Sequence, residues 1–249
     1  MHFPQPLTEA RLVRRYRRFL VDVEGVDGKV WTAHCPNTGS MMGCTEPGSR
    51  VWLSHSPNPR RKYAYTWELV EVASGALVGV HTGRSNQLIG EALDAGLLPQ
   101  WAGGYASRRA ESRVPDLPMR ADWLLQDHTG GEPDCFIEVK NVTAAVEEGV
   151  ALFPDAVTER GRRHLDVLAE WVARGGRAGL VFCVQRTDAE EVRPAEAIDP
   201  DYAAALRRAI AAGVEVAALR LQPSPKGIVP DCPLPVRSEP VAGRISGRS

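Results

Sequence analysis

The segment Ala121-Asp122-Trp123-Leu124-Leu125, followed after a turn by Cys135-Phe136-Ile137-Glu138-Val139-Lys140, decides the fold of this chain. Both segments are mainly apolar and each predicts a strand. The intervening Gly130-Gly131-Glu132-Pro133-Asp134 has the composition of a hairpin turn. The sequence therefore predicts two neighbouring strands joined by a short connection.

Three ionisable residues on these two strands form a candidate catalytic site. Side chains two positions apart in a strand share a face, so Glu138 and Lys140 point the same way, while Ile137 and Val139 point into the core. Asp122, on the neighbouring strand, can reach the face of Glu138. Two carboxylates bind a hard cation through oxygen, and a lysine ammonium beside them can face a water or a phosphate. The pattern predicts Asp122 and Glu138 as metal ligands and Lys140 as a catalytic cation.

The same pattern has a plain alternative, because apolar-Glu-apolar-Lys is how any half-exposed strand alternates. Two observations favour the functional interpretation. The run from Cys135 to Val139 is as apolar as a central strand, where a carboxylate needs a partner or a metal. The chain also has only four lysines among its 30 basic residues, and Lys140 is one of them. A compact ammonium at this position is not interchangeable with a guanidinium.

Length and charge bound the architecture. The 249 residues are enough for one large or two modest domains, and the net charge is −1. Residues 1–82 contain ten Lys and Arg against seven Asp and Glu, whereas 83–249 contain twenty against twenty-four. A basic front and an acidic remainder fit a surface that faces nucleic acid joined to a body that carries carboxylates.

Composition also indicates the compartment. The five cysteines are odd in number, without a C-x-x-C spacing, and two of them lie in strand-like apolar runs typical of free buried thiols. No charged-then-apolar leader and no apolar run approaching ~18 residues is present. We expect a soluble, cytoplasmic protein that does not engage a membrane.

Residues 1–82 predict a small β-barrel. The expected strands are residues 12–23, 30–35, 51–56, 63–72 and 77–80. About five short strands in this length favour a closed or half-closed barrel, which commonly binds single strands through basic and aromatic side chains. The candidate DNA-binding residues here are Arg14, Arg15, Arg17, Arg60, Arg61 and Lys62, interleaved with aromatic residues that include Phe19. An arginine-rich solvated face over an ordinary aromatic core explains the pattern equally well.

The second half predicts an α/β domain. The expected elements are a helix over 86–96, the strand pair, a helix from Asp155 or Thr158 to about Arg174, a buried parallel strand over 178–185, a helix over 200–212 and a strand over 214–219. On the helix before Arg174, Arg160 and His164 are four residues apart and share a face, so they can address a phosphate or belong to a solvated basic stripe. The polar loop from His34 to Ser40 either grips DNA, docks against the second domain, or is a turn without a ligand.

Several separated blocks resemble the sugar fermentation stimulation protein A (SfsA) family of bacteria and archaea. They are Arg14–Leu20, His34–Met41, Ser56–Tyr63, Thr66–Leu69, Cys135–Thr143, Phe153–Gly161 and Ile198–Pro200. The resemblance spans residues 3–236. It implies an OB-fold barrel followed by a PD-(D/E)xK nuclease-like α/β domain with a mixed central sheet, in a DNA-binding protein that some accounts describe as a regulator of sugar (maltose) genes.

The resemblance carries the nuclease signature onto Asp122, Glu138 and Lys140. It makes Glu91 a candidate for the extra acidic residue that such domains often place on their first helix. One departure concerns the approach to the aspartate, where the family usually has Ser-Arg-Ile-Asp-Phe and this chain has Met119-Arg120-Ala121-Asp122-Trp123. The Arg and the Asp are kept, so the site stands, while the approach loop over 107–118 is expected to differ.

Together these observations predict an OB-fold-like domain over 1–82, a nuclease-like domain over 83–239 and a polar, disordered tail over 240–249. The expected function is phosphodiester hydrolysis in DNA with Mg²⁺ or Mn²⁺ as cofactor. The alternative is a non-catalytic DNA-binding regulator. The sequence leaves open whether the DNA is single-stranded or structured, and whether the protein is a monomer or a homodimer.

Overall fold

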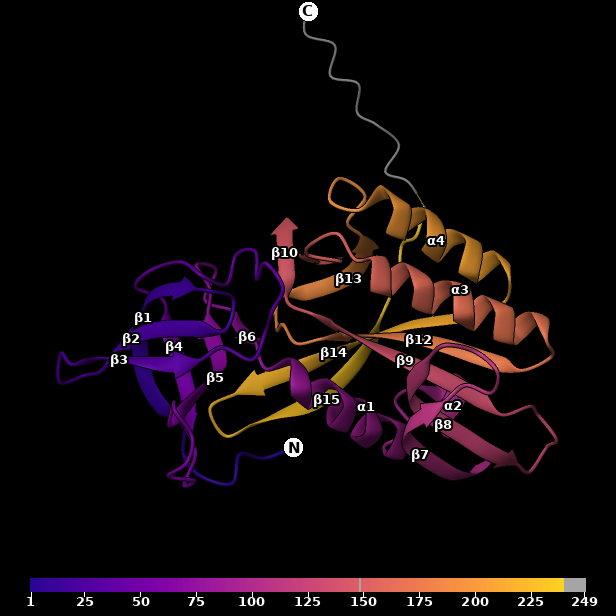
Figure 1. The fold of residues 1–249 in the computed structure, drawn as a ribbon, viewed down its shortest axis with the longest axis horizontal. Helices are drawn as coiled ribbons and strands as arrows, with labels where there is room; N and C mark the ends of the chain where they lie inside the picture. The colour runs from indigo at the N-terminus through magenta and orange to yellow at the C-terminus, as the bar shows by residue number, and fades with distance from the viewer. Residues whose placement is uncertain (148, 240–249) are drawn as a thin grey trace, which may run out of the picture.

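The computed structural model describes residues 1–147 and 149–239. The segment 240–249, expected to be disordered, lies outside the described residues. A barrel of strands occupies one end of the molecule and a sheet flanked by helices occupies the other (Figure 1). No helix within the described residues is long and apolar enough to cross a membrane.

The barrel is built from the first six strands. They are β1 (Thr8–Tyr16), β2 (Leu20–Glu24), β3 (Val30–His34), β4 (Arg50–His55), β5 (Tyr65–Glu71) and β6 (Leu77–Gly79). Their order is β3-β2-β1-β4-β5-β6, and a further pairing of β3 with β5 closes the sheet. Alternating residues of these strands fill the interior around the fully buried Trp67. The expected all-β barrel is confirmed.

The stretch 12–23, expected as one strand, is two strands, because the chain turns inside it. Its second half pairs with the strand that begins at Val30, as expected. Tyr16 pairs with Leu20, and the three residues between them form a hairpin loop. Arg17 and Arg18 there have φ of 49° and 60°. Arg-Arg-Phe contains none of the Gly, Pro, Asn or Asp residues that normally mark a turn, so the apolar alternation seemed to run on.

A larger mixed domain follows. Its elements are η1 (Thr82–Arg84), α1 (Ser85–Asp94), α2 (Pro99–Ala102), β7 (Tyr105–Arg113), β8 (Arg120–His128), β9 (Cys135–Val142), β10 (Ala144–Glu147), β11 (Gly149–Phe153), α3 (Glu159–Ala173), β12 (Arg177–Val184), β13 (Ala189–Pro194), α4 (Pro200–Ala211), β14 (Glu215–Ser224) and β15 (Gly227–Leu234). The main sheet has the order β15-β14-β12-β9-β8-β7, with β9, β12 and β14 parallel and the outer pairings antiparallel. The expected mixed central sheet is confirmed.

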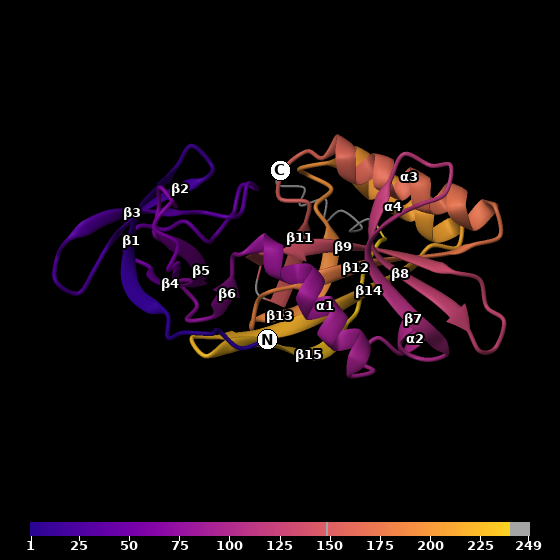
Figure 2. The same ribbon diagram turned by 60° about the horizontal axis from the view of Figure 1, so that its bottom comes forward.

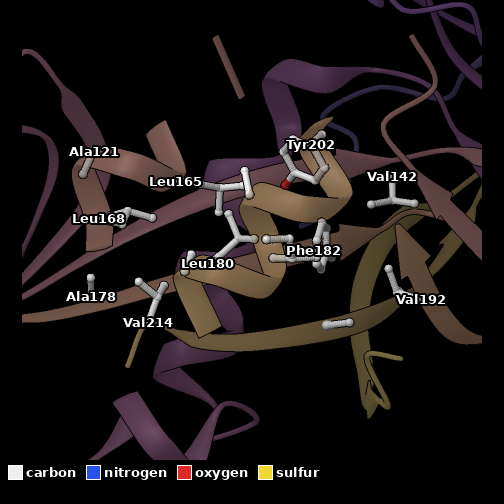
Figure 3. Packing of buried hydrophobic residues seen from close by; sticks show 14 of the residues in the cluster. Ala121, Val142, Leu165, Leu168, Ala178, Leu180, Phe182, Val192, Tyr202 and Val214 are labelled. Atoms are coloured by element: carbon white, nitrogen blue, oxygen red, sulfur yellow. The ribbon is translucent and has the colours of Figure 1, made fainter. Parts of the chain in front are cut away.

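Helices cover both faces of this sheet (Figure 2). Helix α1 packs Leu88 and Ile89 against Ile137 and other residues of one face. Helices α3 and α4 cover the opposite face, where Leu165 and its neighbours meet the residues that alternate with Ile137 (Figure 3). Because Glu138 alternates with Ile137, its side chain faces α3.

The starts of α3 and α4 are capped by side chains and held to each other. Thr158 Oγ1 accepts a hydrogen bond from the amide of Gly161 (3.0 Å), and Asp199 Oδ1 accepts one from the amide of Tyr202 (2.9 Å). The second oxygen of Asp199 accepts the amide of Thr158 at 2.8 Å. Both helices therefore begin where the sequence predicts.

The segment expected as an approach loop over 107–118 contains most of strand β7. Tyr105–Arg113 is almost entirely exposed, because β7 is an edge strand with polar residues on both faces. An edge strand buries too little surface to impose apolar alternation on its sequence. The short strands β10, β11 and β13, which form a second sheet, were also not predicted.

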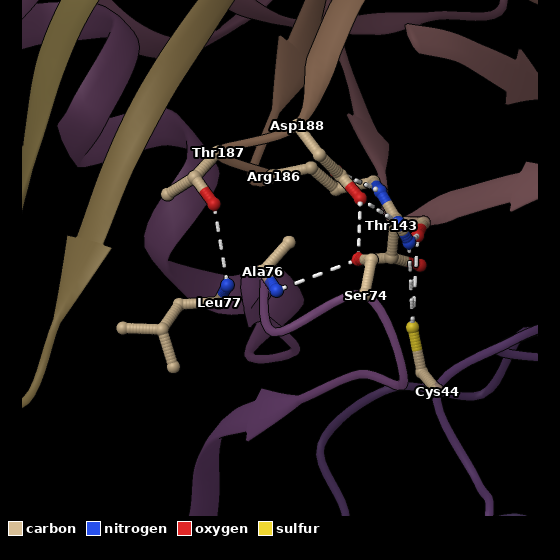
Figure 4. A network of polar contacts seen from close by, with 8 residues as sticks. All are labelled: Cys44, Ser74, Ala76, Leu77, Thr143, Arg186, Thr187 and Asp188. Carbon is tan, nitrogen blue, oxygen red and sulfur yellow. Dashed lines mark hydrogen bonds and ion pairs between the residues drawn. The ribbon is translucent and has the colours of Figure 1, made fainter. Parts of the chain in front are cut away.

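A buried guanidinium joins the barrel to the larger domain (Figure 4). Arg186, 5 % exposed at its side chain, donates to the carbonyl of Thr143 (2.8 Å) and forms a bidentate pair with Asp188. Ser74 of the barrel donates to Asp188, and Cys44 of the barrel contacts both Arg186 and Thr143. Side chains of the barrel therefore complete a polar network whose centre, Arg186 with Asp188, belongs to the larger domain.

Candidate active site at the fork between two strands

The candidate acids lie where strands β8 and β9 separate. The ladder between them comprises the pairs Leu125–Cys135, Leu124–Phe136 and Trp123–Ile137, and it stops there. Asp122 and Glu138 are the next residues on the two strands. Beyond this point β9 stays paired with β12 on its other side. The fork frees backbone groups and places the two acids near enough for the charge of Glu138 to raise the pKa of Asp122.

The carboxylate of Asp122 replaces the missing strand pairing. Its Oδ2 accepts the amide of Val139 at 2.7 Å, and its Oδ1 accepts the side-chain amide of Asn86 at 2.8 Å. Burial and the nearby charge of Glu138 raise the pKa of Asp122 to about 6, against the lowering effect of these hydrogen bonds. Asp122 is thus an acid that its surroundings make costly to ionise.

Glu138 is 5 % exposed and has two cationic or donor neighbours. Lys140 Nζ donates to Glu138 Oε1 at 2.6 Å, and His164 Nδ1 lies 2.6 Å from the same oxygen. Burial acts to raise the pKa of Glu138, but the hydrogen bonds and charges of His164 and Lys140 outweigh it and lower that pKa below its ordinary value. Glu138 Oε2 accepts no hydrogen bond from any described residue.

This donor set fits a hydrated divalent cation. Two acids held together repel, and a cation between them relieves that repulsion. Among the described residues no group of three His, Cys, Asp or Glu side chains is placed to hold a metal ion. The protein therefore offers two carboxylates, which suits Mg²⁺ because that ion commonly keeps several waters.

Glu91 does not join the pair, contrary to expectation. Its Oε2 lies 2.5 Å from the amino group of Met1, and its Oε1 accepts the side-chain amide of Gln87 at 3.0 Å. Both partners lie away from Asp122. On the same helix it is Asn86 that reaches the aspartate, so α1 supports the site with an amide rather than an acid. Sequence reasoning missed Asn86, since nothing local marks an amide that contacts a strand 36 residues later.

His164 belongs to the acid site rather than to a free phosphate-binding face. Its Nδ1 faces Glu138, while Arg160 Nε donates to its Nε2 at 3.3 Å. An Nε2 that accepts a hydrogen bond places the ring proton on Nδ1, which then donates to Glu138. Arg160 and His164 do share one face of α3, as expected, but only Arg160 is exposed.

Arg15 is also not a free DNA ligand. Its guanidinium donates to the carbonyls of Arg18, Asn37, Gly39 and Ser40 at 2.8–3.2 Å. Its two terminal nitrogens therefore donate to backbone oxygens of two barrel loops. Alternation along a strand cannot distinguish a side chain that reaches solvent from one that curls onto a neighbouring loop.

The remaining basic candidates of the barrel keep exposed side chains. Arg14 is 68 % exposed although it pairs with Asp22, and Arg17 lies at the tip of the β1–β2 hairpin. Arg60, Arg61 and Lys62 are exposed on the connection between β4 and β5. Of the basic residues predicted to bind DNA in the barrel, these five have side chains that are exposed to solvent.

The polar loop of the barrel docks against the second domain, one of the three alternatives left open. Asp155 Oδ2 accepts the amide of Met41 at 2.9 Å, and a Cβ at Gly39 would clash with the Asp155 carboxylate. Pro36 accepts the hydroxyl of Thr82 at 2.9 Å. The loop is therefore part of the contact between the two parts of the chain.

Comparisons with known proteins agree with this architecture. Residues 13–80 match a family model described as the SfsA N-terminal OB domain, and residues 83–227 match one described as the sugar fermentation stimulation protein RE domain. A sugar fermentation stimulation protein homolog of Halorhodospira halophila is 75 % identical over 236 residues, covering 95 % of this chain and 98 % of that protein. A homolog of Alkalilimnicola ehrlichii is 64 % identical, with 95 % and 99 % covered.

A solved structure is similar as well. The structure of Pyrococcus furiosus SfsA in complex with Ca²⁺ superposes with a TM-score of 0.82 at 27 % identity. The match covers 95 % of this chain and 98 % of that one. The likeness therefore extends over both the barrel and the mixed α/β domain.

Proposed function

The chain belongs to the sugar fermentation stimulation protein family, and we propose that it is a metal-dependent nuclease that hydrolyses phosphodiester bonds of DNA. The observation that carries the proposal is the fork, where Asp122 accepts the amide next to Glu138 and Lys140 donates to Glu138. Two acids can hold a divalent cation, and a neighbouring amine can stabilise negative charge on a phosphate, so these groups suit metal-dependent cleavage of a phosphodiester.

Each residue has a role that follows from its contacts. Asp122 and Glu138 hold the cation, Mg²⁺ or Mn²⁺, which when bound supplies Lewis-acid chemistry and lowers the pKa of a coordinated water. Lys140 places a compact positive charge beside the phosphate oxygens, where negative charge develops. Asn86 and His164 orient the two carboxylates through the hydrogen bonds they donate.

The solved structure of the Pyrococcus relative supports a divalent cation, since that protein is in complex with Ca²⁺. Ca²⁺ and Mg²⁺ are both hard ions that select carboxylate oxygen. The free Oε2 of Glu138 and the repulsion between the two acids give the same indication from this chain's own residues.

DNA is the proposed substrate because the exposed charge of the barrel is positive. Arg60, Arg61 and Lys62 follow one another on a single loop, and Arg14 and Arg17 lie on the β1–β2 hairpin. Contacts from such side chains to phosphates give affinity without sequence selection. These same residues favour the second candidate function, a regulator that binds DNA without cleaving it.

Cleavage assays separate the two candidates. Purified protein is incubated with a plasmid and with a single-stranded oligonucleotide, in Mg²⁺ or in chelator. We expect cleavage in Mg²⁺ alone and its loss in Glu138→Gln, by more than about 100-fold, since even residues that only support metal ligands cost 10–100-fold when changed.

Glu71→Gln is the matched control. It makes the same change in a glutamate that pairs with Arg50 on the outside of the barrel, so activity is expected to stay. Products that form in chelator, or that Glu138→Gln forms as fast as the unchanged protein, would refute the nuclease. A gel shift that shows bound DNA, together with no cleavage product, would support the second candidate function, a regulator that binds DNA without cleaving it.

A further inference from the structure

Phe19 is an aromatic side chain that the fold leaves in solvent. It is 52 % exposed, and it is the one phenylalanine, tyrosine or tryptophan of the described chain that is not at least half-buried. It lies in the three-residue loop of the β1–β2 hairpin, directly after Arg17 and Arg18, whose side chains are also exposed. An exposed ring that follows two cationic side chains gains little from the core.

The loop that carries Phe19 is held in an unfavourable backbone conformation. Both Arg17 and Arg18 have positive φ, a region that disfavours residues with a Cβ. Glycine or asparagine would relieve this strain, yet two arginines occupy the positions. Strain kept at a loop tip is a reason to look for a function of the side chains that it presents.

Hydrogen bonds hold the backbone of the β1–β2 loop in place. Arg15 binds the carbonyl of Arg18 at 3.1 Å and, with the same guanidinium, the carbonyls of the adjacent loop at Asn37 and Gly39. The carbonyl of Phe19 accepts the amide of Cys35 at 2.7 Å. The backbone of the tip is thus fixed although its side chains are free.

These contacts continue into the domain that carries the acids. Gly39 and Met41 contact Asp155, which precedes α3, the helix whose His164 faces Glu138. A DNA strand held at the hairpin tip is therefore held at a fixed position relative to the fork. A loop backbone that is already fixed lowers the ordering cost of binding a flexible strand.

We propose that Phe19 stacks on an unpaired base of a DNA strand while Arg17 and Arg18 contact the phosphates beside it. The aromatic face offers stacking to any base, and the two guanidinium groups match the charge of the backbone. This inference rests on the proposed DNA substrate and specifies it: the strand that reaches the barrel is single-stranded or locally opened.

The test measures binding in chelator, so that cleavage plays no part. Anisotropy titrations use a labelled single-stranded oligonucleotide, the same oligonucleotide with abasic positions throughout, and its duplex. Phe19→Ala is expected to weaken binding of the single strand about 10-fold, the order reported for loss of one base–aromatic stack. Binding of the abasic strand and of the duplex is expected to change by less than 2-fold.

Val26→Ala is the matched control, because Val26 is an apolar residue that is 98 % exposed on the β2–β3 hairpin of the same barrel. Phe19→Trp is expected to restore the affinity. Should Phe19→Ala fail to fold, Phe19→Leu keeps the apolar bulk without a ring and serves in its place.

The outcomes separate this inference from the proposed function. If the unchanged protein binds no DNA, the DNA substrate fails and the stacking site fails with it. If it binds and Phe19→Ala binds equally well, or loses affinity equally for the abasic strand, only the stacking site is overturned. A loss confined to strands that carry bases supports it.

Discussion

Two buried glutamates on central strands, one in each part of the molecule, have different surroundings. Glu68 on β5 is fully buried, and Arg84 donates to both of its oxygens while Ser54 donates to one. Glu138 on β9 takes both of its donors on Oε1 and has a second acid, Asp122, beside it. Both glutamates have cationic partners, but only Glu68 has a hydrogen-bond donor on each of its oxygens.

The difference teaches how to separate a structural buried charge from a functional one. A single acid with a bidentate arginine has a donor on each of its oxygens, and the pair ties β5 to the connecting helix η1. Two acids with one free oxygen repel each other, and either a proton on Asp122 or an additional cation relieves that repulsion. Burial alone is the same in both places, so it does not decide.

The largest effect is expected at Lys140. Lys140→Met should lower the cleavage rate by about 100–1,000-fold, the usual cost of removing one group that stabilises transition-state charge. Lys140→Arg keeps the charge but not the compact ammonium, so it should stay well below the unchanged protein. Single-turnover rates at saturating DNA measure this. Full activity in Lys140→Met would reduce Lys140 to a neutraliser of Glu138, as Arg84 is for Glu68.

Metal binding should distinguish the two glutamates next. Mg²⁺ or Ca²⁺ at 100 times its dissociation constant stabilises a protein with one site by about 2.7 kcal/mol. We expect a rise in Tm for the unchanged protein and for Glu68→Gln, and none for Glu138→Gln. Differential scanning fluorimetry without DNA provides the measurement. An equal rise in all three proteins would place the cation elsewhere.

Glu68→Gln should cost stability instead of activity. Breaking the pair leaves the Arg84 guanidinium incompletely matched, and we expect a loss of about 2–3 kcal/mol in the free energy of unfolding, below the full range for a buried pair because Arg84 is 27 % exposed. The control is Glu71→Gln on the same strand, where an exposed pair should cost less than about 1 kcal/mol. Urea unfolding gives both values, and equal losses would contradict the comparison.

The smallest effect has the opposite sign. The folded protein raises the pKa of Asp122, so ionising it opposes folding above that pKa of about 6, and the cost vanishes as pH falls below the unfolded value. Asp122→Asn should therefore stabilise the metal-free protein by about 1–2 kcal/mol at pH 8. The amide of Asn86 can rotate to meet the new side chain.

The advantage of Asp122→Asn should shrink on acidification from pH 8 towards pH 4.5. Thermal melts in chelator across this range measure the change. A variant that is less stable than the unchanged protein at pH 8 would show that the two hydrogen bonds of Asp122 outweigh its burial.

Much of the candidate site follows from the sequence because strand alternation is local. Glu138 and Lys140 share a face in any strand, and Asp122 is brought opposite by a short hairpin. Glu91 was misassigned because helical periodicity fixes a face only relative to the helix itself. Which strand that face meets is decided by packing, and α1 turns Asn86 towards Asp122 and Glu91 towards Met1.

The fold was predictable to a similar extent. Buried strands such as β12 are predicted by their apolar runs, and helices α3 and α4 by the capping residues at their starts. The hairpin at Arg17 and the edge strand β7 are not, since the first lacks a turn residue and the second lacks a buried face. Their partner strands, β2 and β8, follow directly in the chain, so what the sequence lacks is a local signal rather than a nearby partner.

The shared guanidinium of Arg186 has a consequence for how the molecule melts. Separating the barrel from the larger domain would remove the contact of Cys44 with Arg186, whose side chain is 5 % exposed, and the hydrogen bond from Ser74 to Asp188. Neither half can come apart without penalising the other. Calorimetry should therefore record one cooperative transition for the whole chain rather than two independent ones.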